Sequence, residues 1–290
     1  MIKLCKIAML FSGFSAFAQI PETDIFVADI EIKNNLVKVE KVQKINHTKA
    51  YNNQPFFTPD NKNILFSSET NGKDKIHICR YDIKGKKIKK LTATQTSEYS
   101  PGLAPDGSLS SVVVEEDSTQ RIWLFDVNTG AKKACVHTGT DSVGYYAWLG
   151  KDSILYYKLT NPHSLRVLNL KTGEDNWLCD HPMRSFKKID AATFFYVIHE
   201  EKHNLIYFFD IRTQKATLYA NDKPQNMDYV WQPDLGLVKS EQSRIYRYSV
   251  ETKVWAEVAD FSSFGIKEIT RFAFSADKKR IAVVSNAVEK

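Results

Sequence analysis

The sequence predicts an all-β fold, a six-bladed β-propeller whose ring is closed by the two ends of the chain. The composition is that of a globular protein rich in strands, with 43% hydrophobic, 26% charged and 12% aromatic residues and only 12 Gly and 9 Pro in 290 residues. One strand pattern recurs six times, at intervals of 53, 44, 43, 41 and 39 residues. Turn signals separate the copies, and a propeller can use a chain of this length as one unit.

The chain begins with a segment typical of a secretory signal peptide, residues 1–18. Two lysines precede a short apolar run, and the small residues Ala16 and Ala18 stand at the −3 and −1 positions before Gln19. About 11 apolar residues are too few to cross a hydrocarbon core roughly 30 Å thick, so we expect cleavage before Gln19 and no membrane span. Residues 19–290 then form one domain, periplasmic or secreted.

The charge balance argues against nucleic acid as a partner. Forty Lys and Arg against 34 Asp and Glu give +6, and removal of Lys3 and Lys6 with the signal peptide leaves +4. This excess is small and scattered along the chain, whereas a nucleic-acid surface needs a concentrated basic patch.

Each repeat contains an apolar, alternating strand that ends on an Asp-like residue. These end residues are Asp29, Asp82, Asp126, Asn169, Asp210 and Ser249. A tight-turn marker precedes most copies: Pro59-Asp60-Asn61, Pro105-Asp106-Gly107, Gly150-Lys151-Asp152, Pro233-Asp234 and Ala276-Asp277. A polar turn and a further strand follow, so each period of about 40 to 45 residues makes four short strands, one propeller blade.

The two ends of the mature chain each supply half a blade. Strands expected at 25–30 and 36–45 correspond to the third and outermost strands of a repeat, and those expected at 270–277 and 280–285 correspond to the first and second. Paired in one sheet, they complete a sixth blade and leave the ring without an open edge.

Three strings then resemble the Pro-Asp-Gly-Lys repeats of TolB-like propellers, a WD-repeat-like pattern. They are Asn52 to Asp60, Glu98 to Gly107 and Phe274 to Ala282. The resemblance covers residues 24–288, although the copies ending at Asn169 and Asp210 keep only the strand pattern. It implies an exported six-bladed propeller related to the C-terminal domain of TolB and to the propellers of prolyl-oligopeptidase-type enzymes, without the additional domains of either. Because the repeat carries the fold, the resemblance says little about activity.

Several motifs with known chemistry are better explained by the fold. His199-Glu-Glu-Lys-His203 matches the zinc motif H-E-x-x-H, but strand-like runs flank it, so we expect a hairpin turn and no metal site. The repeat aspartates Asp29, Asp82, Asp126 and Asp210 are expected to cap turns. Outside the signal peptide, Cys79, Cys135 and Cys179 have no C-x-x-C spacing and are expected to be small buried hydrophobes. No motif for a cofactor is present in the sequence.

The segments that lead into the first strand of each blade are the candidate binding positions, because a propeller directs them toward the mouth of its central channel. Their side chains combine aromatic platforms with directional polar groups. The candidate ligand-binding residues are Asn53, Gln54, Glu98, Tyr99, Tyr145, Arg184, Asp228, Tyr229 and Arg271. The alternative is that these groups solvate the channel and hold the blades together.

Two functions fit this reading. The first is a monomeric, non-enzymatic propeller that binds a partner protein, a peptide or a small envelope ligand at the channel mouth. The second is a lyase or hydrolase acting on peptide or carbohydrate, with Glu98 or Asp228 as acid or base and Arg271 stabilising negative charge. The sequence contains no G-x-S-x-G nucleophile motif and does not disclose a ligand or a reaction.

Overall fold

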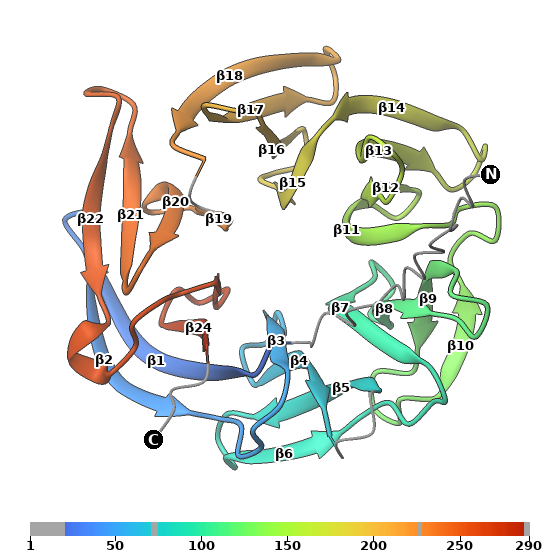
Figure 1. Ribbon diagram of the computed structural model, residues 1–290, viewed down its shortest axis with the longest axis horizontal. Coiled ribbons are helices and arrows are strands. Elements are labelled where there is room, and N and C mark those ends of the chain that lie inside the picture. Colours follow the sequence, from blue (N-terminus) through green and yellow to red (C-terminus); the bar gives the residue numbers. More distant parts are fainter. Residues whose placement is uncertain (1–20, 71–74, 225–227, 287–290) are drawn as a thin grey trace, which may run out of the picture.

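The computed structural model describes residues 21–70, 75–224 and 228–286, so the expected signal peptide and its cleavage site lie outside the described residues. Within these ranges, 24 strands form six four-stranded antiparallel sheets. The sheets surround one central axis, each with its first strand innermost and its last at the rim (Figure 1). The predicted all-β, six-bladed propeller is confirmed.

We number the blades in chain order and give their strands from the axis outward. Blade 1 consists of β3 (Asn52–Phe57), β4 (Asn63–Glu69), β5 (Ile76–Asp82) and β6 (Lys87–Lys90). Blade 2 consists of β7 (Ser97–Leu103), β8 (Leu109–Val114), β9 (Gln120–Phe125) and β10 (Lys132–Cys135). Blade 3 consists of β11 (Val143–Gly150), β12 (Ser153–Lys158), β13 (Ser164–Asn169) and β14 (Asp175–Asp180). Blade 4 consists of β15 (Pro182–Lys188), β16 (Thr193–His199), β17 (Asn204–Asp210) and β18 (Lys215–Asp222). Blade 5 consists of β19 (Tyr229–Gln232), β20 (Gly236–Glu241), β21 (Arg244–Ser249) and β22 (Val254–Asp260). Blade 6 is β23 (Arg271–Phe274), β24 (Arg280–Asn286), β1 (Thr23–Lys33) and β2 (Leu36–Lys44).

Blade 6 closes the ring with strands from both ends of the chain. Strand β1 pairs with β24 in antiparallel register, from Thr23 opposite Asn286 to Asp29 opposite Arg280. The predicted closure is therefore confirmed. Pairing the two ends in one sheet satisfies backbone groups that an open ring would leave at two exposed edges.

The hydrophobic core lies between neighbouring blades, and the second strand of each blade is buried on both faces. On β16, Phe194 packs with Leu155 of blade 3, and the next residue, Phe195, packs with Leu237 of blade 5. Successive side chains on a strand point to opposite faces, so one apolar strand serves two cores. This explains why each second strand contains consecutive apolar residues.

The repeat aspartates mostly cap turns, as predicted. Asp126 Oδ1 accepts hydrogen bonds from the backbone N–H groups two and three residues ahead, at 3.0 and 2.8 Å. Asp82 and Asp210 cap the corresponding turns in the same way. For Asp29 the prediction was wrong: β1 continues past it to Lys33, and its carboxylate pairs with Arg280 at 3.3 Å.

Cys79, Cys135 and Cys179 are free thiols. Cys79 and Cys179 are buried as expected, whereas Cys135, on the outermost strand of blade 2, is half-buried. Burial raises the pKa of the Cys79 thiol to about 11 and that of the Cys179 thiol to about 12, so both stay protonated at neutral pH.

Candidate functional site: the axial channel

Backbone irregularities in the innermost strands shape one end of the channel. Gln54 and Ser100 have φ angles of 59° and 53°, each directly before a proline, in the left-handed region that such residues rarely adopt. Four of the six innermost strands have register shifts here: between Asn53 and Phe56, Tyr99 and Gly102, Val143 and Tyr145, and Pro182 and Phe186. Bulges of this kind redirect side chains away from strict alternation, and they are frequent beside functional sites.

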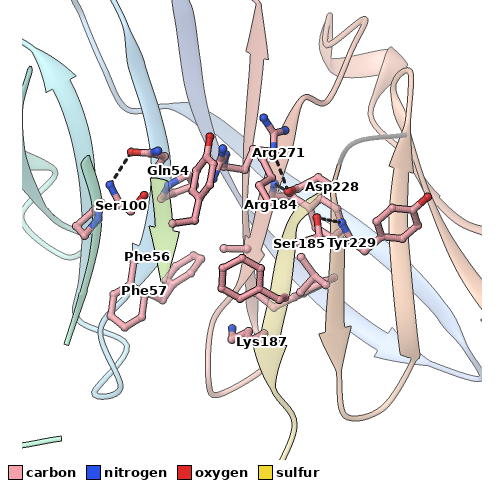
Figure 2. A pocket seen from close by; sticks show the side chains of 18 of the residues that line it. Gln54, Phe56, Phe57, Ser100, Arg184, Ser185, Lys187, Asp228, Tyr229 and Arg271 are labelled. Carbon is pink, nitrogen blue, oxygen red and sulfur yellow. Dashed lines mark hydrogen bonds and ion pairs between the residues drawn. The ribbon is translucent and has the colours of Figure 1, made fainter. Parts of the chain in front are cut away.

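The bulged strands border an axial cavity of about 230 Å³, which we call the channel cavity. Figure 2 shows Gln54, Arg184 and Arg271 together at one end of it. The polar residues that line it are Gln54, Ser100, Tyr145, Tyr146, Arg184, Ser185, Lys187, Asp228, Tyr229 and Arg271. Six of the sequence-predicted residues thus line the cavity, from five different blades: Gln54, Tyr145, Arg184, Asp228, Tyr229 and Arg271.

Two arginines and one aspartate dominate the electrostatics of this end. Asp228 Oδ1 lies 3.7 Å from Arg184 Nε, and Asp228 Oδ2 accepts a hydrogen bond of 3.0 Å from the backbone N–H of Phe272. Arg184 Nη2 donates to the carbonyl oxygen of Thr270 at 2.6 Å. Blades 4, 5 and 6 are therefore joined at the axis through these groups.

The environment shifts the pKa of all three charged groups. Burial raises the pKa of Asp228, although Arg184 and Arg271 both favour its ionised form. Burial and the like charge of Arg271 lower the pKa of Arg184. Burial also disfavours the charge of Arg271, but Asp228, Tyr145 and Tyr51 together outweigh this effect, and the pKa of Arg271 is raised.

Tyr145 and Tyr51 lie near Arg271. Its guanidinium carbon lies 5.6 Å from the centroid of the Tyr145 ring, within the range of a cation–π contact. Tyr51 and Tyr99 meet edge to face, with centroids 6.1 Å apart. Burial raises the pKa of the Tyr51 hydroxyl, so this group stays neutral and can donate a hydrogen bond.

Gln54 is fixed by neighbours on two blades. Its Oε1 atom accepts hydrogen bonds from Ser67 Oγ at 2.8 Å and from the backbone N–H of Ser100 at 2.7 Å. The Asn53 side chain, in turn, accepts from the backbone N–H of Gln54 at 2.8 Å. Asn53 therefore supports the bulge and is not part of the cavity wall.

The deeper part of the channel cavity is apolar and ends at a lysine. Phe56, Phe186 and Phe274 contribute aromatic rings to its wall, and Lys187 lies beyond Phe56 in Figure 2. The Lys187 side chain is exposed to the channel, and desolvation by the surrounding protein lowers the pKa of its amine. A second cavity of about 290 Å³, also lined by Lys187 and Phe186, continues from this point.

Three of the predicted residues point elsewhere. Glu98 is fully buried between blades 1 and 2, where His77, Thr92, Thr94 and Thr96 contact its carboxylate. The Tyr229 ring turns away from the cavity, and its hydroxyl donates to Asp222 at 3.0 Å in a buried network with Lys239 and Asn204. Tyr99 is half-buried and contacts Tyr51 and the core between blades 2 and 3.

The H-E-x-x-H match is a hairpin, as predicted. His199 ends β16, Asn204 begins β17, and the backbone N–H of Glu200 donates to the carbonyl oxygen of His203 at 2.9 Å. His199 Nδ1 lies 2.9 Å from Asn204 Oδ1. The two histidines therefore have no helical spacing, which the zinc motif requires.

A wider groove of about 570 Å³ adjoins the channel cavity and shares Tyr145 and Arg184 with it. His163, His181 and His199 lie along this groove. In the part of the chain that the structure describes, no group of three or more His, Cys, Asp or Glu side chains is placed to hold a metal ion. The groove extends the channel mouth outward over blades 3 and 4.

Comparison with known proteins finds similarity in structure and none in sequence families. No family model and no curated protein matches the chain. A TolB protein from Agrobacterium tumefaciens is 14% identical with a TM-score of 0.68, over 93% of this chain and 99% of that one. TolB from Acinetobacter baumannii is also 14% identical, with a TM-score of 0.58 over 92% of this chain and 65% of that one.

The chain has the TolB-like propeller fold. An oligogalacturonate lyase solved with manganese shares it at 11% identity, with a TM-score of 0.56 over 86% of this chain and 80% of that one. Since one fold serves both TolB proteins and a lyase, function has to be argued from the residues of the site.

Several wall residues were not singled out as candidates from the sequence. Ser100 and Phe186 lay in the segments considered but were not chosen, and Phe56, Lys187 and Phe274 lie further along innermost strands that themselves line the channel. Gln54, Pro55, Phe56 and Phe57 of β3 all line the cavity, and the available signal was Pro55, because a proline inside a strand marks a bulge.

Proposed function

We propose that the protein is an exported, non-enzymatic propeller that binds a partner protein, a peptide or a small envelope ligand at the mouth of its channel. The observation that carries this proposal is the convergence of Gln54, Tyr145, Arg184, Asp228 and Arg271 on one cavity. Side chains from five blades meet around the axis, so a single molecule can contact all of them. A closed ring of sheets supplies a rigid platform for such contacts.

Export rests on the sequence of residues 1–18. In the described ranges, no helix is long and apolar enough to cross a membrane. We therefore propose that the mature chain begins at Gln19 and acts as a monomer in the periplasm or outside the cell.

Site-specific photo-crosslinking in the native host tests this proposal. A photoreactive residue replaces Tyr145 at the channel mouth, and a control replaces Trp177, which is exposed on outermost strand β14. We expect mass adducts on the protein with the probe at 145, and their loss when Arg271→Gln is added. The same intact-mass measurement shows at which residue the mature chain begins.

Adducts that form equally at 177, or at neither position, would contradict binding at the channel mouth. A mature mass that retains residues 1–18 would contradict export.

A lyase or hydrolase remains the second candidate, favoured by the raised pKa of Asp228 beside Arg271. Glu98, the other proposed acid or base, is not in the cavity wall, so of the described wall residues only Asp228 carries a carboxyl group. This candidate requires turnover of a peptide or carbohydrate that Asp228→Asn abolishes. Binding of the same substrate without turnover favours the first proposal.

A further inference from the structure

Positive charge exceeds negative charge in the channel cavity. Of the described side chains in its wall, Arg184, Arg271 and Lys187 are cationic and Asp228 alone is anionic. The charge of Asp228 favours the charged form of both guanidinium groups. Surrounding protein screens charges poorly, so an anionic group that enters this cavity is stabilised more strongly than it would be at the surface.

Neither arginine is committed to a two-pronged pair with Asp228. The Nε atoms of Arg184 and Arg271 are buried and have no hydrogen-bond partner among the described residues, and neither does the hydroxyl oxygen of Ser100 in the same wall. Arg184 Nε lies 3.7 Å from Asp228 Oδ1, too far for a hydrogen bond, and Asp228 Oδ2 accepts from the backbone N–H of Phe272. The planar fork of an arginine pairs best with a carboxylate. Two arginines line this cavity, and of their nitrogens Arg184 Nη2 is bonded to the carbonyl oxygen of Thr270.

An apolar region adjoins the arginines. Phe56, Phe186 and Phe274 line the same cavity, and Figure 2 places Phe56 between the level of Arg271 and that of Lys187. A ligand that reaches in from the mouth past the arginines therefore meets aromatic rings. The volume of the channel cavity, about 230 Å³, is below that of a pocket for a drug-sized ligand. The cavity therefore fits a small molecule or the end of a longer chain.

We propose that the channel cavity binds a carboxylate that carries an apolar or aromatic body. Arg271 and Arg184 hold the carboxylate, and the body packs against Phe56, Phe186 and Phe274. This inference rests on the proposed function, because it concerns the same channel mouth. The carboxylate belongs either to a free small acid or to the C-terminus of a peptide, and these share the recognised chemistry.

Calorimetric titration of the mature protein with matched probes tests the inference. The probes are 3-phenylpropionate, its neutral amide, acetate, and the dipeptide N-acetyl-Gly-Phe as free acid and as amide. We expect at least one aromatic acid to bind roughly ten-fold or more tightly than its own amide and than acetate, because only the acid forms charge-assisted bonds. Tighter binding of 3-phenylpropionate than of N-acetyl-Gly-Phe identifies a free small acid as the source of the carboxylate. Tighter binding of the dipeptide identifies the C-terminus of a peptide.

Variants then locate the carboxylate. We expect Arg271→Gln to weaken binding of the aromatic acid roughly ten-fold or more. Arg212→Gln, on an exposed turn beside Asp210, is the matched control and should leave affinity unchanged. Lys187→Met should change it less than Arg271→Gln does, and thermal unfolding checks that each variant folds.

Three results would overturn the inference. If the parent binds acid and amide equally and Arg271→Gln binds neither, the binding site is correct but the preference for an anion is wrong. If Lys187→Met loses binding and Arg271→Gln does not, the arginines do not hold the carboxylate. Failure of all probes, while crosslinks still form at position 145, overturns the ligand class alone; failure of both experiments overturns the proposed function as well.

Discussion

Glu98 shows how one buried carboxylate can join two blades. It has no solvent exposure, and its two oxygens contact His77 of β5 at 3.0 Å, Thr92 at 2.9 Å, Thr96 at 3.2 Å and Thr94. His77 belongs to blade 1 and Glu98 to blade 2, so the network bridges their interface. Such a network is favourable only while every member keeps its partner.

We expect Glu98→Ala to lower the free energy of unfolding by about 3 kcal/mol, because several buried donors lose their acceptor together. Glu251→Ala, in the exposed turn after β21, is the control and should stay within about 0.5 kcal/mol of the parent. Urea unfolding measures both. A Glu98→Ala protein as stable as the control would show that the network does not stabilise the interface.

At the scale of an element, Asp260 ends β22 and fixes the connection to blade 6. Its carboxylate accepts from the backbone N–H of Ser262 at 2.8 Å and from Ser243 Oγ at 3.0 Å, and it pairs with Arg244 at 3.1 Å. These bonds, chiefly that from the Ser262 backbone, lower its pKa to about 2, against burial.

Asp260 is therefore expected to contribute stability that depends on pH. The folded pKa lies below the unfolded value of about 3.9, so the contribution is complete above that value and is lost as the pH falls toward 2. We expect the difference in stability between the parent and Asp260→Asn to shrink between about pH 4 and pH 2. Denaturant unfolding at several pH values measures it, and a constant difference would rule out this linkage.

The sequence predicted elements well wherever a local signal sets them, and site residues less well. The capped turns at Asp82, Asp126 and Asp210 depend on neighbours two or three residues away, so their spacing alone identified the blades. The direction of Tyr229 and Glu98 depends on contacts with other blades, and register shifts alter strand alternation near the channel. Neither is visible in a strand pattern.

At the scale of the whole molecule, the ring depends on blade 6. Deleting residues 269–290 removes β23 and β24, and β1 and β2 then lose the sheet partner that pairs with Thr23 to Asp29. We expect this truncated chain to lose cooperative melting at the parent temperature, because buried edges and core residues such as Val283 are removed together. A chain ending at Asn286 keeps both strands and serves as the control.

Calorimetry of the two truncated chains decides the matter. If the chain without residues 269–290 still unfolded in one transition at the parent temperature, the closing blade would not be essential to the ring.

The pairing of β1 with β24 also determines when the ring can close during synthesis, which runs from the N-terminus to the C-terminus. Asp29 is synthesised early, and its partner Arg280 follows only about 250 residues later, which takes roughly 13 to 50 s at 5–20 residues per second. Throughout that interval β1 has no partner for one of its edges. The ring can close only once β24 has emerged, so blades 1 to 5 are synthesised before the sheet that joins them can form.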